Sequence, residues 1–230
     1  MESIIQSPNI SSAGIRAFFT SKHFSENHNS MRDALLKKLS LEEDQVYLPV
    51  QKHTSHIHVL ESSFDPVAAD AVITDRPEVL IGIIVADCVP VLVHDQKNNI
   101  IGAVHAGWKG TAEGILEKTL LLMMERFHSR PDDVLVSIGP SIKKCSYEVD
   151  PHVKDALESR TGPGNYSDPK GDKYMVDLAE ANRIQALNSG VPERNIWKSE
   201  DCTYCNPDKY YSYRYRKETT GRQGGFIGMW

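Results

Sequence analysis

The stretch LIGIIVADCVPVLVHDQKNNIIGAVH, residues 80–105, contains the pattern that decides the fold. Its three apolar runs, Leu80–Ala86, Val89–His94 and Ile100–His105, have the length and the Val and Ile content of buried strands. The polar segment Asp95–Asn99 predicts a hairpin turn between the second and third runs. An acid and a thiol follow the first run, and a histidine ends the third. The stretch therefore predicts a sheet whose strand ends present functional side chains.

Outward from this stretch the chain mixes strand and helix patterns. Further strands are expected at Gly14–Phe19, Val46–Val50, Ala71–Thr74, Val134–Ile138, Tyr210–Arg214 and Phe226–Trp230. Helices are expected at Met31–Leu39 with Ser30 as the cap, at Thr111–Phe127, at Pro151–Glu158 and at Leu178–Asn188, ended by Gly190. A loop is expected at Thr161–Lys173, which is dense in Gly and Pro. Strands outnumber helices and come in runs, so we expect an α+β fold, with mixed β-sheets flanked by helices in one compact domain over residues 1–230.

Composition and charge argue against several classes of protein. The 230 residues are 40% hydrophobic and 25% charged, which is typical of a soluble globular protein. A net charge of −5, without any block of Lys and Arg, argues against a nucleic-acid binder. The longest apolar run, Val79–Ala86, is too short to span a membrane. The N-terminus lacks the basic and apolar regions of a secretory signal, so we expect a cytoplasmic protein with reduced cysteines.

Three side chains near predicted strand ends are suited to binding a metal ion. His53 lies in PVQKHT, Cys88 ends LIGIIVADC, and His105 opens HAGWKG. Two imidazoles and one thiolate leave a fourth position for water or substrate, as in catalytic zinc sites. Spacing alone leaves other interpretations open, because Cys88 could be a buried small apolar side chain and the histidines could serve in hydrogen bonding. Cys88 could also be a nucleophile paired with His105, as in cysteine hydrolases.

Polar groups beside these three residues suggest further catalytic roles. Asp87 could orient a ligand or act as a general acid or base. Lys109 could lower the pKa of the Cys88 thiol if it lies nearby. A helix beginning near Thr111 would point free backbone amides at the preceding turn, which suits an anion such as phosphate. Later in the chain, Arg214 and Arg222 are further candidates for binding an anion.

Seven short motifs occur in order along the chain. They are QKH (51–53), ADAVIT (69–74), ADCVPVL (86–92), HAGWKGT (105–111), IGPSI (138–142), YEV (147–149) and SYR with TGR (212–214 and 220–222). Together they resemble the YfiH-like family, also called the laccase-domain or multicopper polyphenol oxidase family, from about Gly14 to the C-terminus. The combination of ADCxP with HAGW followed by Lys or Arg and Gly is highly specific for that family.

The resemblance implies an activity and a cofactor. It implies that His53, Cys88 and His105 bind zinc. It also implies phosphorolysis of adenosine, inosine, guanosine or methylthioadenosine and deamination of adenosine, with purine nucleosides and phosphate as partners. Some members are linked to correcting peptidoglycan precursors, which would suit the hydrolase interpretation. A non-enzymatic metal-binding protein is a third interpretation of the chain. Neither the oligomeric state nor the preferred nucleoside follows from the sequence.

The copper label of the family and the remaining cysteines need separate interpretations. Multicopper oxidases carry several H-x-H pairs, whereas this chain has nine His and a single such pair, His56 and His58. One chain cannot supply a trinuclear cluster and a mononuclear copper. A single copper bound in vitro by the same three ligands stays open, because divalent copper outcompetes zinc. Cys202 and Cys205 form one C-x-x-C, interpreted as structural with a metal or redox role as the alternative, and Cys145 lies far away in sequence.

Overall fold

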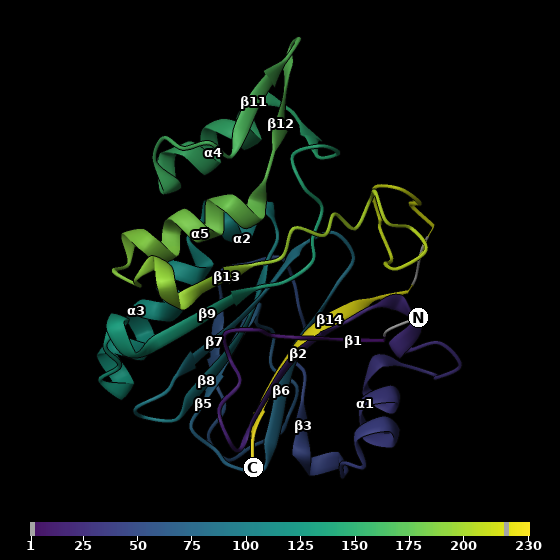
Figure 1. The fold of residues 1–230 in the computed structure, drawn as a ribbon, viewed down its shortest axis with the longest axis vertical. Coiled ribbons are helices and arrows are strands. Elements are labelled where there is room, and N and C mark those ends of the chain that lie inside the picture. Colours follow the sequence, from purple (N-terminus) through teal and green to yellow (C-terminus); the bar gives the residue numbers. More distant parts are fainter. Residues whose placement is uncertain (1–2, 219–220) are drawn as a thin grey trace.

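A five-stranded sheet forms one layer of the computed structural model, which describes residues 3–218 and 221–230 (Figure 1). The strand order is β1 (Ile4–Gln6), β2 (Ile15–Thr20), β14 (Gln223–Met229), β6 (Val79–Val85) and β3 (Val46–Tyr47). Neighbouring strands are antiparallel except for β3 and β6, which are parallel. The predicted closing strand is therefore present as β14, and it lies between β2 and β6.

A six-stranded sheet forms the second layer. The strand order is β13 (Ile196–Lys198), β9 (Val134–Ile138), β7 (Val89–Asp95), β8 (Ile100–Ala106), β5 (Ala71–Thr74) and β4 (Ile57–Val59). The outer pairs β13–β9 and β5–β4 are parallel, and the inner pairs are antiparallel. The predicted hairpin between β7 and β8 is confirmed, and Asp95 Oδ1 accepts hydrogen bonds from the turn amides of Lys97 and Asn98 at 2.9 and 3.0 Å.

Helices cover the outer faces of the two sheets (Figure 1). On the five-stranded sheet lies α1 (Met31–Leu39), where Ser30 accepts the Asp33 amide as the predicted cap. On the other side are α2 (Trp108–Ala112), α3 (Ile115–Phe127), α4 (Pro151–Thr161) and α5 (Leu178–Asn188), followed by a small sheet of β10 (Glu148–Val149), β12 (Lys173–Val176) and β11 (Ser167–Lys170). Short 3-10 turns lie at Lys22–Phe24, Glu43–Gln45, Pro131–Asp133 and Glu193–Asn195. None of the described helices is long and apolar enough to cross a membrane.

Both faces of the six-stranded sheet are buried. Along β7, Leu92 packs between the two sheets, whereas Val91 and Val93 pack against the helices. Successive side chains of a strand point to opposite faces, so a strand buried on both faces has an unbroken apolar sequence. This explains why the apolar runs of the central stretch are continuous rather than alternating. The predicted α+β fold of mixed sheets flanked by helices in one compact unit is confirmed.

Two predicted elements are interrupted in the structure. The helix expected over Thr111–Phe127 is two helices, because Gly114 adopts a left-handed φ of 73° between α2 and α3. The first of these begins at Trp108. The loop expected over Thr161–Lys173 contains β11 and the start of β12, joined through Gly171 with a φ of 62°. The Gly and Pro content there belongs partly to a hairpin.

Two predicted strands differ more strongly. Tyr210–Arg214 forms turns instead of a strand, so the alternation of tyrosines misled the prediction. The backbone N–H and C=O of Tyr211 pair with the side-chain amide of Gln223 at 2.9 Å each, which replaces a strand partner. The strand expected over Val46–Val50 ends at Tyr47, and Val50 forms only an isolated bridge with Ala68.

Candidate active site

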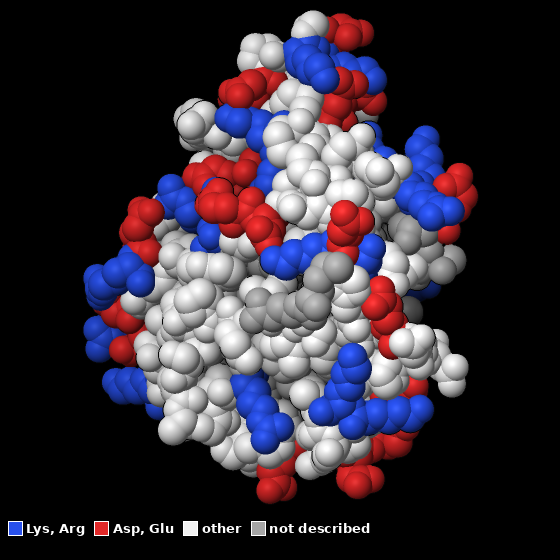
Figure 2. Space-filling view, turned by 45° about the vertical axis from the view of Figure 1, so that its right-hand side comes forward, with Lys and Arg blue, Asp and Glu red and all other residues white. Residues whose placement is uncertain are grey.

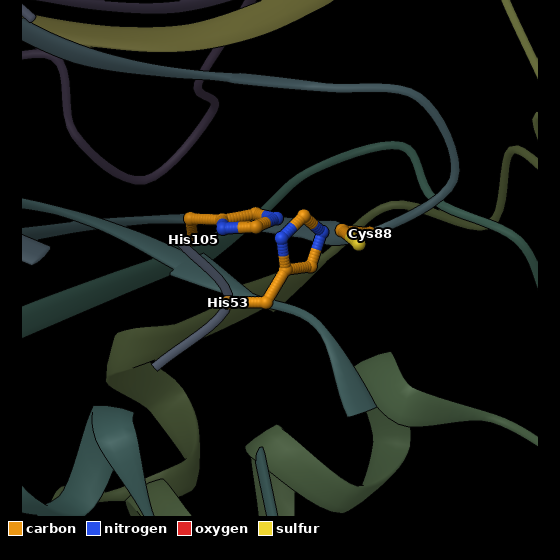
Figure 3. A group of neighbouring side chains, drawn as sticks. All are labelled: His53, Cys88 and His105. Carbon is orange, nitrogen blue, oxygen red and sulfur yellow. The ribbon is translucent and has the colours of Figure 1, made fainter. Parts of the chain in front are cut away.

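His53, Cys88 and His105 lie together where three chain segments meet (Figure 3). His53 is in the loop between β3 and β4, Cys88 is in the link from β6 to β7, and His105 is near the end of β8. Their ligand atoms all lie within 4.8 Å of one another. Zinc bonds to nitrogen and sulfur are about 2.0–2.3 Å long, so one ion placed between these atoms needs only small adjustments. We call this set the histidine–cysteine cluster.

The buried carboxylate of Asp70 organises two of the three ligands. Its Oδ1 accepts hydrogen bonds from His105 Nδ1 at 2.7 Å and from the His53 amide at 3.0 Å. Its Oδ2 accepts the Lys52 and Thr54 amides at 3.1 and 2.7 Å. With Nδ1 of His105 donating to Asp70, Nε2 is left for a metal ion. Sequence reasoning missed Asp70, although an acid at the start of the apolar ADAVIT run was a signal.

In this cluster, hydrogen bonds together shift the pKa values more strongly than burial does. Burial opposes ionisation of Asp70, but hydrogen bonds from His105 and Thr54 hold its pKa far below the usual range. Burial also opposes the Cys88 thiolate, yet hydrogen bonds with His105 and His53 lower the pKa of Cys88 to about 6. Against burial, Asp70 and Cys88 raise the pKa of His105 to about 9. Without metal, the cluster therefore holds a thiolate, the form that binds metal ions.

Glycines leave room for the three ligands to meet. A Cβ at Gly107 would lie 3.1 Å from Cys88 Sγ and 3.4 Å from His53 Cδ2. A Cβ at Gly110 would lie 3.1 Å from the Thr54 carbonyl oxygen. The predicted lack of side-chain bulk in HAGWKG therefore lets this turn pack closely against the loop that carries His53.

Asp87 is engaged in hydrogen bonds that shape the wall of the site. It has a left-handed φ of 85°, its Oδ1 accepts a hydrogen bond from Thr203 Oγ1 at 2.6 Å, and its Oδ2 accepts one from the Arg214 amide at 2.7 Å. Nearby, the side-chain amide of Gln51 donates to the Ile84 carbonyl and accepts the Ile84 amide at 2.8 and 2.9 Å. Asp87 and Gln51 thus anchor the surrounding segments to the central strands.

A pocket of about 700 Å³ opens beside the histidine–cysteine cluster. Besides the three ligands, its lining includes Asp87, Trp108, Tyr147, Arg214 and Arg222. Burial raises the pKa of Tyr147 to about 12, so the phenol stays neutral at ordinary pH. Such a volume, with an apolar lining and a few polar groups, is typical of a site for a small molecule.

The two predicted arginines contribute to this pocket in different ways. The guanidinium carbon of Arg214 lies 5.2 Å from the centre of the Tyr147 ring. Arg222 donates from Nη1 to the Gly221 carbonyl at 2.7 Å. Gly221 cannot carry a Cβ without meeting the Tyr211 ring at 2.3 Å. Thr220 of the TGR motif lies outside the described residues.

Lys109 and the amides before Thr111 are placed differently from the prediction. Lys109 is exposed, its Nζ lies 5.7 Å from the centre of the Trp108 ring, and it is not among the residues that line the pocket. The Thr111 amide donates to the Gly107 carbonyl at 2.8 Å, because α2 begins earlier than expected. The helix start was therefore predicted about three residues too late, and the Thr111 amide is not one of its free amides.

Charges on the visible surface are mixed rather than gathered. Figure 2 shows Lys and Arg interspersed with Asp and Glu over one face of the molecule, with uncharged surface between them. A mixed surface provides little general attraction for an anion. Attraction for a negatively charged ligand would therefore depend on cations in the pocket lining, where Arg214 and Arg222 are the arginines among the described residues.

The fold and the cluster define a class of protein in which two stacked mixed sheets carry a His₂Cys set beside a pocket. The family model described as multi-copper polyphenol oxidoreductase laccase matches residues 18–230, so the chain belongs to this family. The resemblance stated from the motifs is thereby confirmed.

Several relatives carry names that refer to nucleosides. The purine nucleoside phosphorylase YlmD of Geobacillus stearothermophilus is 40% identical over 162 residues, which cover 69% of this chain and 59% of that protein. A purine nucleoside phosphorylase of Bacteroides thetaiotaomicron is 34% identical over 205 residues, 82% of this chain and 74% of that protein. The crystal structure of YlmD from Geobacillus stearothermophilus superposes with a TM-score of 0.88 at 32% identity, covering 99% of this chain and 96% of that one.

Proposed function

We propose that this chain is a zinc-dependent purine nucleoside phosphorylase that also deaminates adenosine. Its expected substrates are adenosine, inosine, guanosine or methylthioadenosine, together with phosphate. The observation that carries the proposal is the histidine–cysteine cluster beside a pocket that also presents two arginines. The names of the two relatives support the substrate class.

The donor set fits zinc. Asp70 occupies Nδ1 of His105, Cys88 favours the thiolate, and Gly107 leaves the space between the ligands clear of side chain. His53, Cys88 and His105 would hold the ion, with a fourth position left for water or substrate. When bound, zinc supplies Lewis acidity that promotes nucleophilic attack by water or stabilises developing negative charge.

The chain's own residues would orient the two substrates. Trp108 and Tyr147 offer aromatic surface for a purine base, and the neutral Tyr147 phenol can donate a hydrogen bond. Arg214 and Arg222 can hold phosphate oxygens with charge-assisted hydrogen bonds. In phosphorolysis a phosphate oxygen bonds to ribose C1′ while the C1′–N9 bond breaks, and the purine leaves with the electron pair and takes up a proton. In deamination, water adds at C6 of adenine and ammonia leaves.

A panel of nucleosides incubated with metal-defined protein tests this proposal. With zinc and phosphate, we expect the free base and ribose 1-phosphate in equal amounts. Without phosphate, only adenosine should react, giving inosine and ammonia. Absence of base release from all four nucleosides at full zinc occupancy would overturn the phosphorylase assignment, and absence of inosine would overturn the deaminase assignment.

One observation favours a second candidate, a cysteine hydrolase. Cys88, His105 and Asp70 form a nucleophile, base and carboxylate series, with Asp70 Oδ1 2.7 Å from His105 Nδ1. This arrangement would suit hydrolysis of an amide or ester, such as one in a peptidoglycan precursor. His53 is neither the nucleophile nor the base in that mechanism, although its hydrogen bond helps to lower the pKa of Cys88. Retained amide or ester hydrolysis by zinc-free His53→Ala protein would therefore favour the hydrolase.

The family's copper label is less compatible with these residues. Among the described residues, two groups of three potential metal ligands occur, and one of them contains no histidine. Neither group provides the imidazoles of a trinuclear copper cluster. A single copper ion bound by the histidine–cysteine cluster would compete with zinc in vitro. Copper binding alone would thus be weak evidence for polyphenol oxidation.

A further inference from the structure

Three cysteine sulfurs lie together outside the pocket, in a group that we call the thiol cluster. Its members are Cys145, Cys202 and Cys205, whose sulfur atoms all lie within 4.8 Å of one another. None of the three lines the pocket beside the histidine–cysteine cluster. We propose that the thiol cluster is a second metal site that binds zinc through three thiolates, with water at the fourth position.

Sulfur separations in the thiol cluster suit a shared ion better than a covalent pair. Cys145 Sγ and Cys205 Sγ are 3.5 Å apart. Sulfurs bound to one tetrahedral zinc at about 2.3 Å lie roughly 3.8 Å apart, whereas a disulfide bond is about 2.05 Å long. Soft thiolate ligands favour zinc over calcium or magnesium. Cys145 and Cys205 are exposed, so the fourth position of the ion can face solvent.

The backbone supports the buried sulfur of the thiol cluster. Cys202 is buried, and the backbone amides of Lys143 and Cys205 hydrogen-bond to its sulfur. The two segments that supply the thiols are joined, because Ser141 and Cys202 form a parallel bridge and the Thr203 amide donates to the Ser141 carbonyl at 3.1 Å. The thiols are therefore gathered by the fold rather than by flexible side chains.

A buried cation provides independent support for an anionic complex at this place. Lys143 is 6% exposed, and its Nζ has no hydrogen-bond partner among the described residues. Charged or ionisable groups that act on it include Asp177, Glu200 and Cys202 as well as the cation Lys198. Three thiolates and one zinc ion carry a net charge of about −1. The ammonium of Lys143 would balance that charge.

A bound ion would also affect the neighbouring pocket wall. Thr203 lies between the two cysteines of the C-x-x-C and donates to Asp87, which in turn accepts the Arg214 amide. Zinc in the thiol cluster would hold the turn that carries Thr203, so its role is structural. No member of the thiol cluster borders that pocket, so the proposed ion has no place among the reacting groups.

Zinc stoichiometry of reduced, metal-free protein tests the proposal without relying on activity. After zinc loading and removal of excess, the natural chain should hold two zinc ions per chain by mass spectrometry of the metal. Cys205→Ser and Cys145→Ser should each hold one, and both positions are exposed, so folding should be kept. Ser146→Ala is the matched control, because it removes the hydroxyl 3.2 Å from Cys205 Sγ but no ligand, and it should hold two.

A second measurement isolates the thiol cluster from the other site. His53→Ala protein loaded with cobalt(II) should show the strong sulfur-to-metal absorption of three thiolates, and the added substitution Cys205→Ser should remove most of it. Zinc at about 100 times its Kd should raise the melting temperature of His53→Ala protein by roughly 5–10 °C. Absence of thiolate-to-cobalt absorption in folded His53→Ala protein, unchanged zinc content in Cys205→Ser, or a Cys145–Cys205 disulfide in zinc-loaded protein would overturn the proposal. One zinc per natural chain that is lost in Cys205→Ser would instead contradict zinc in the histidine–cysteine cluster.

Discussion

The histidine–cysteine cluster and the thiol cluster are both closely spaced but have different surroundings. Each brings three ligand atoms within 4.8 Å. The first combines two imidazoles with one thiol, is oriented by the buried Asp70 and borders a pocket. The second consists of thiols alone, is held by backbone amides and lies outside that pocket. The comparison teaches that closeness of ligand atoms is shared by both clusters, whereas access to a pocket would separate a catalytic metal site from a structural one.

Removal of a ligand from the histidine–cysteine cluster should have the largest effect. If the proposed function is right, His53→Ala should lower kcat/KM for phosphorolysis by at least ~10³-fold, because a catalytic metal ion typically contributes several kcal/mol of transition-state stabilisation. His53 is exposed, so the fold should be kept. Steady-state kinetics on inosine, with metal content measured in parallel, check this. The exposed neighbour His56→Ala is the control and should change neither quantity.

Loss of the carboxylate that orients the ligands should have an intermediate effect. Asp70→Asn keeps the shape of the side chain but weakens its hydrogen bonds to His105 Nδ1 and the His53 amide. Removal of such partners typically weakens metal affinity by between about 10- and 100-fold. Zinc competition with a chelator measures this change. Asp65→Asn, which makes the same charge change at an exposed position, should leave the affinity unaltered, and equal affinities in both variants would contradict the role of Asp70.

Most of the fold could be predicted from the sequence, and the elements that were predicted wrongly differ for physical reasons. Continuous apolar runs mark strands buried on both faces, so the central strands were predicted almost to the residue. In Tyr210–Arg214 the tyrosines alternate with other residues as they would in a strand, but the segment is not a strand. Tyr210 is buried there, and its hydroxyl donates to Asp201 at 2.6 Å. Local periodicity cannot distinguish these two cases.

Site residues could be predicted from the sequence where each lies in a recognisable motif. They could not be predicted where contacts between distant segments determine their role. Asp70 is 35 residues from His105, and nothing local to either shows their hydrogen bond. Cys145 is 60 residues from Cys205, so the C-x-x-C was interpreted without its third partner. Lys109 follows His105 closely in sequence, yet it is an exposed helix residue that is not among those lining the pocket. Residues far apart in sequence can therefore share a site, and residues close in sequence can lie outside it.

A substitution in the pocket that leaves both clusters intact should affect only the binding of phosphate. Arg222→Ala should raise the KM for phosphate roughly tenfold or more, because a charge-assisted hydrogen bond contributes about 1.5–3 kcal/mol. Zinc content and deamination of adenosine should stay unchanged. Arg216→Ala, an exposed cation that does not line the pocket, is the control. An unaltered phosphate dependence would show that Arg222 has a structural role.

The smallest effect is expected from crowding the ligands. Gly107→Ala would place a methyl group 3.1 Å from Cys88 Sγ, which requires a shift of a few tenths of an ångström. Such overpacking costs about 1 kcal/mol, so zinc affinity of the histidine–cysteine cluster should fall about fivefold. Gly102→Ala is the matched control, since its Cβ would meet no atom closer than 3.6 Å. Chelator competition on the two variants should reveal the difference.

The central claim is that zinc in the histidine–cysteine cluster alone enables phosphorolysis. Its most direct test is a zinc titration of metal-free Cys145→Ser/Cys205→Ser protein, which keeps that cluster and lacks the other, while ribose 1-phosphate formation from inosine and phosphate is followed. We predict that the rate rises from background and reaches a plateau at one zinc per chain. Full activity before zinc is added, or no activity at one zinc per chain in folded protein, would contradict the claim.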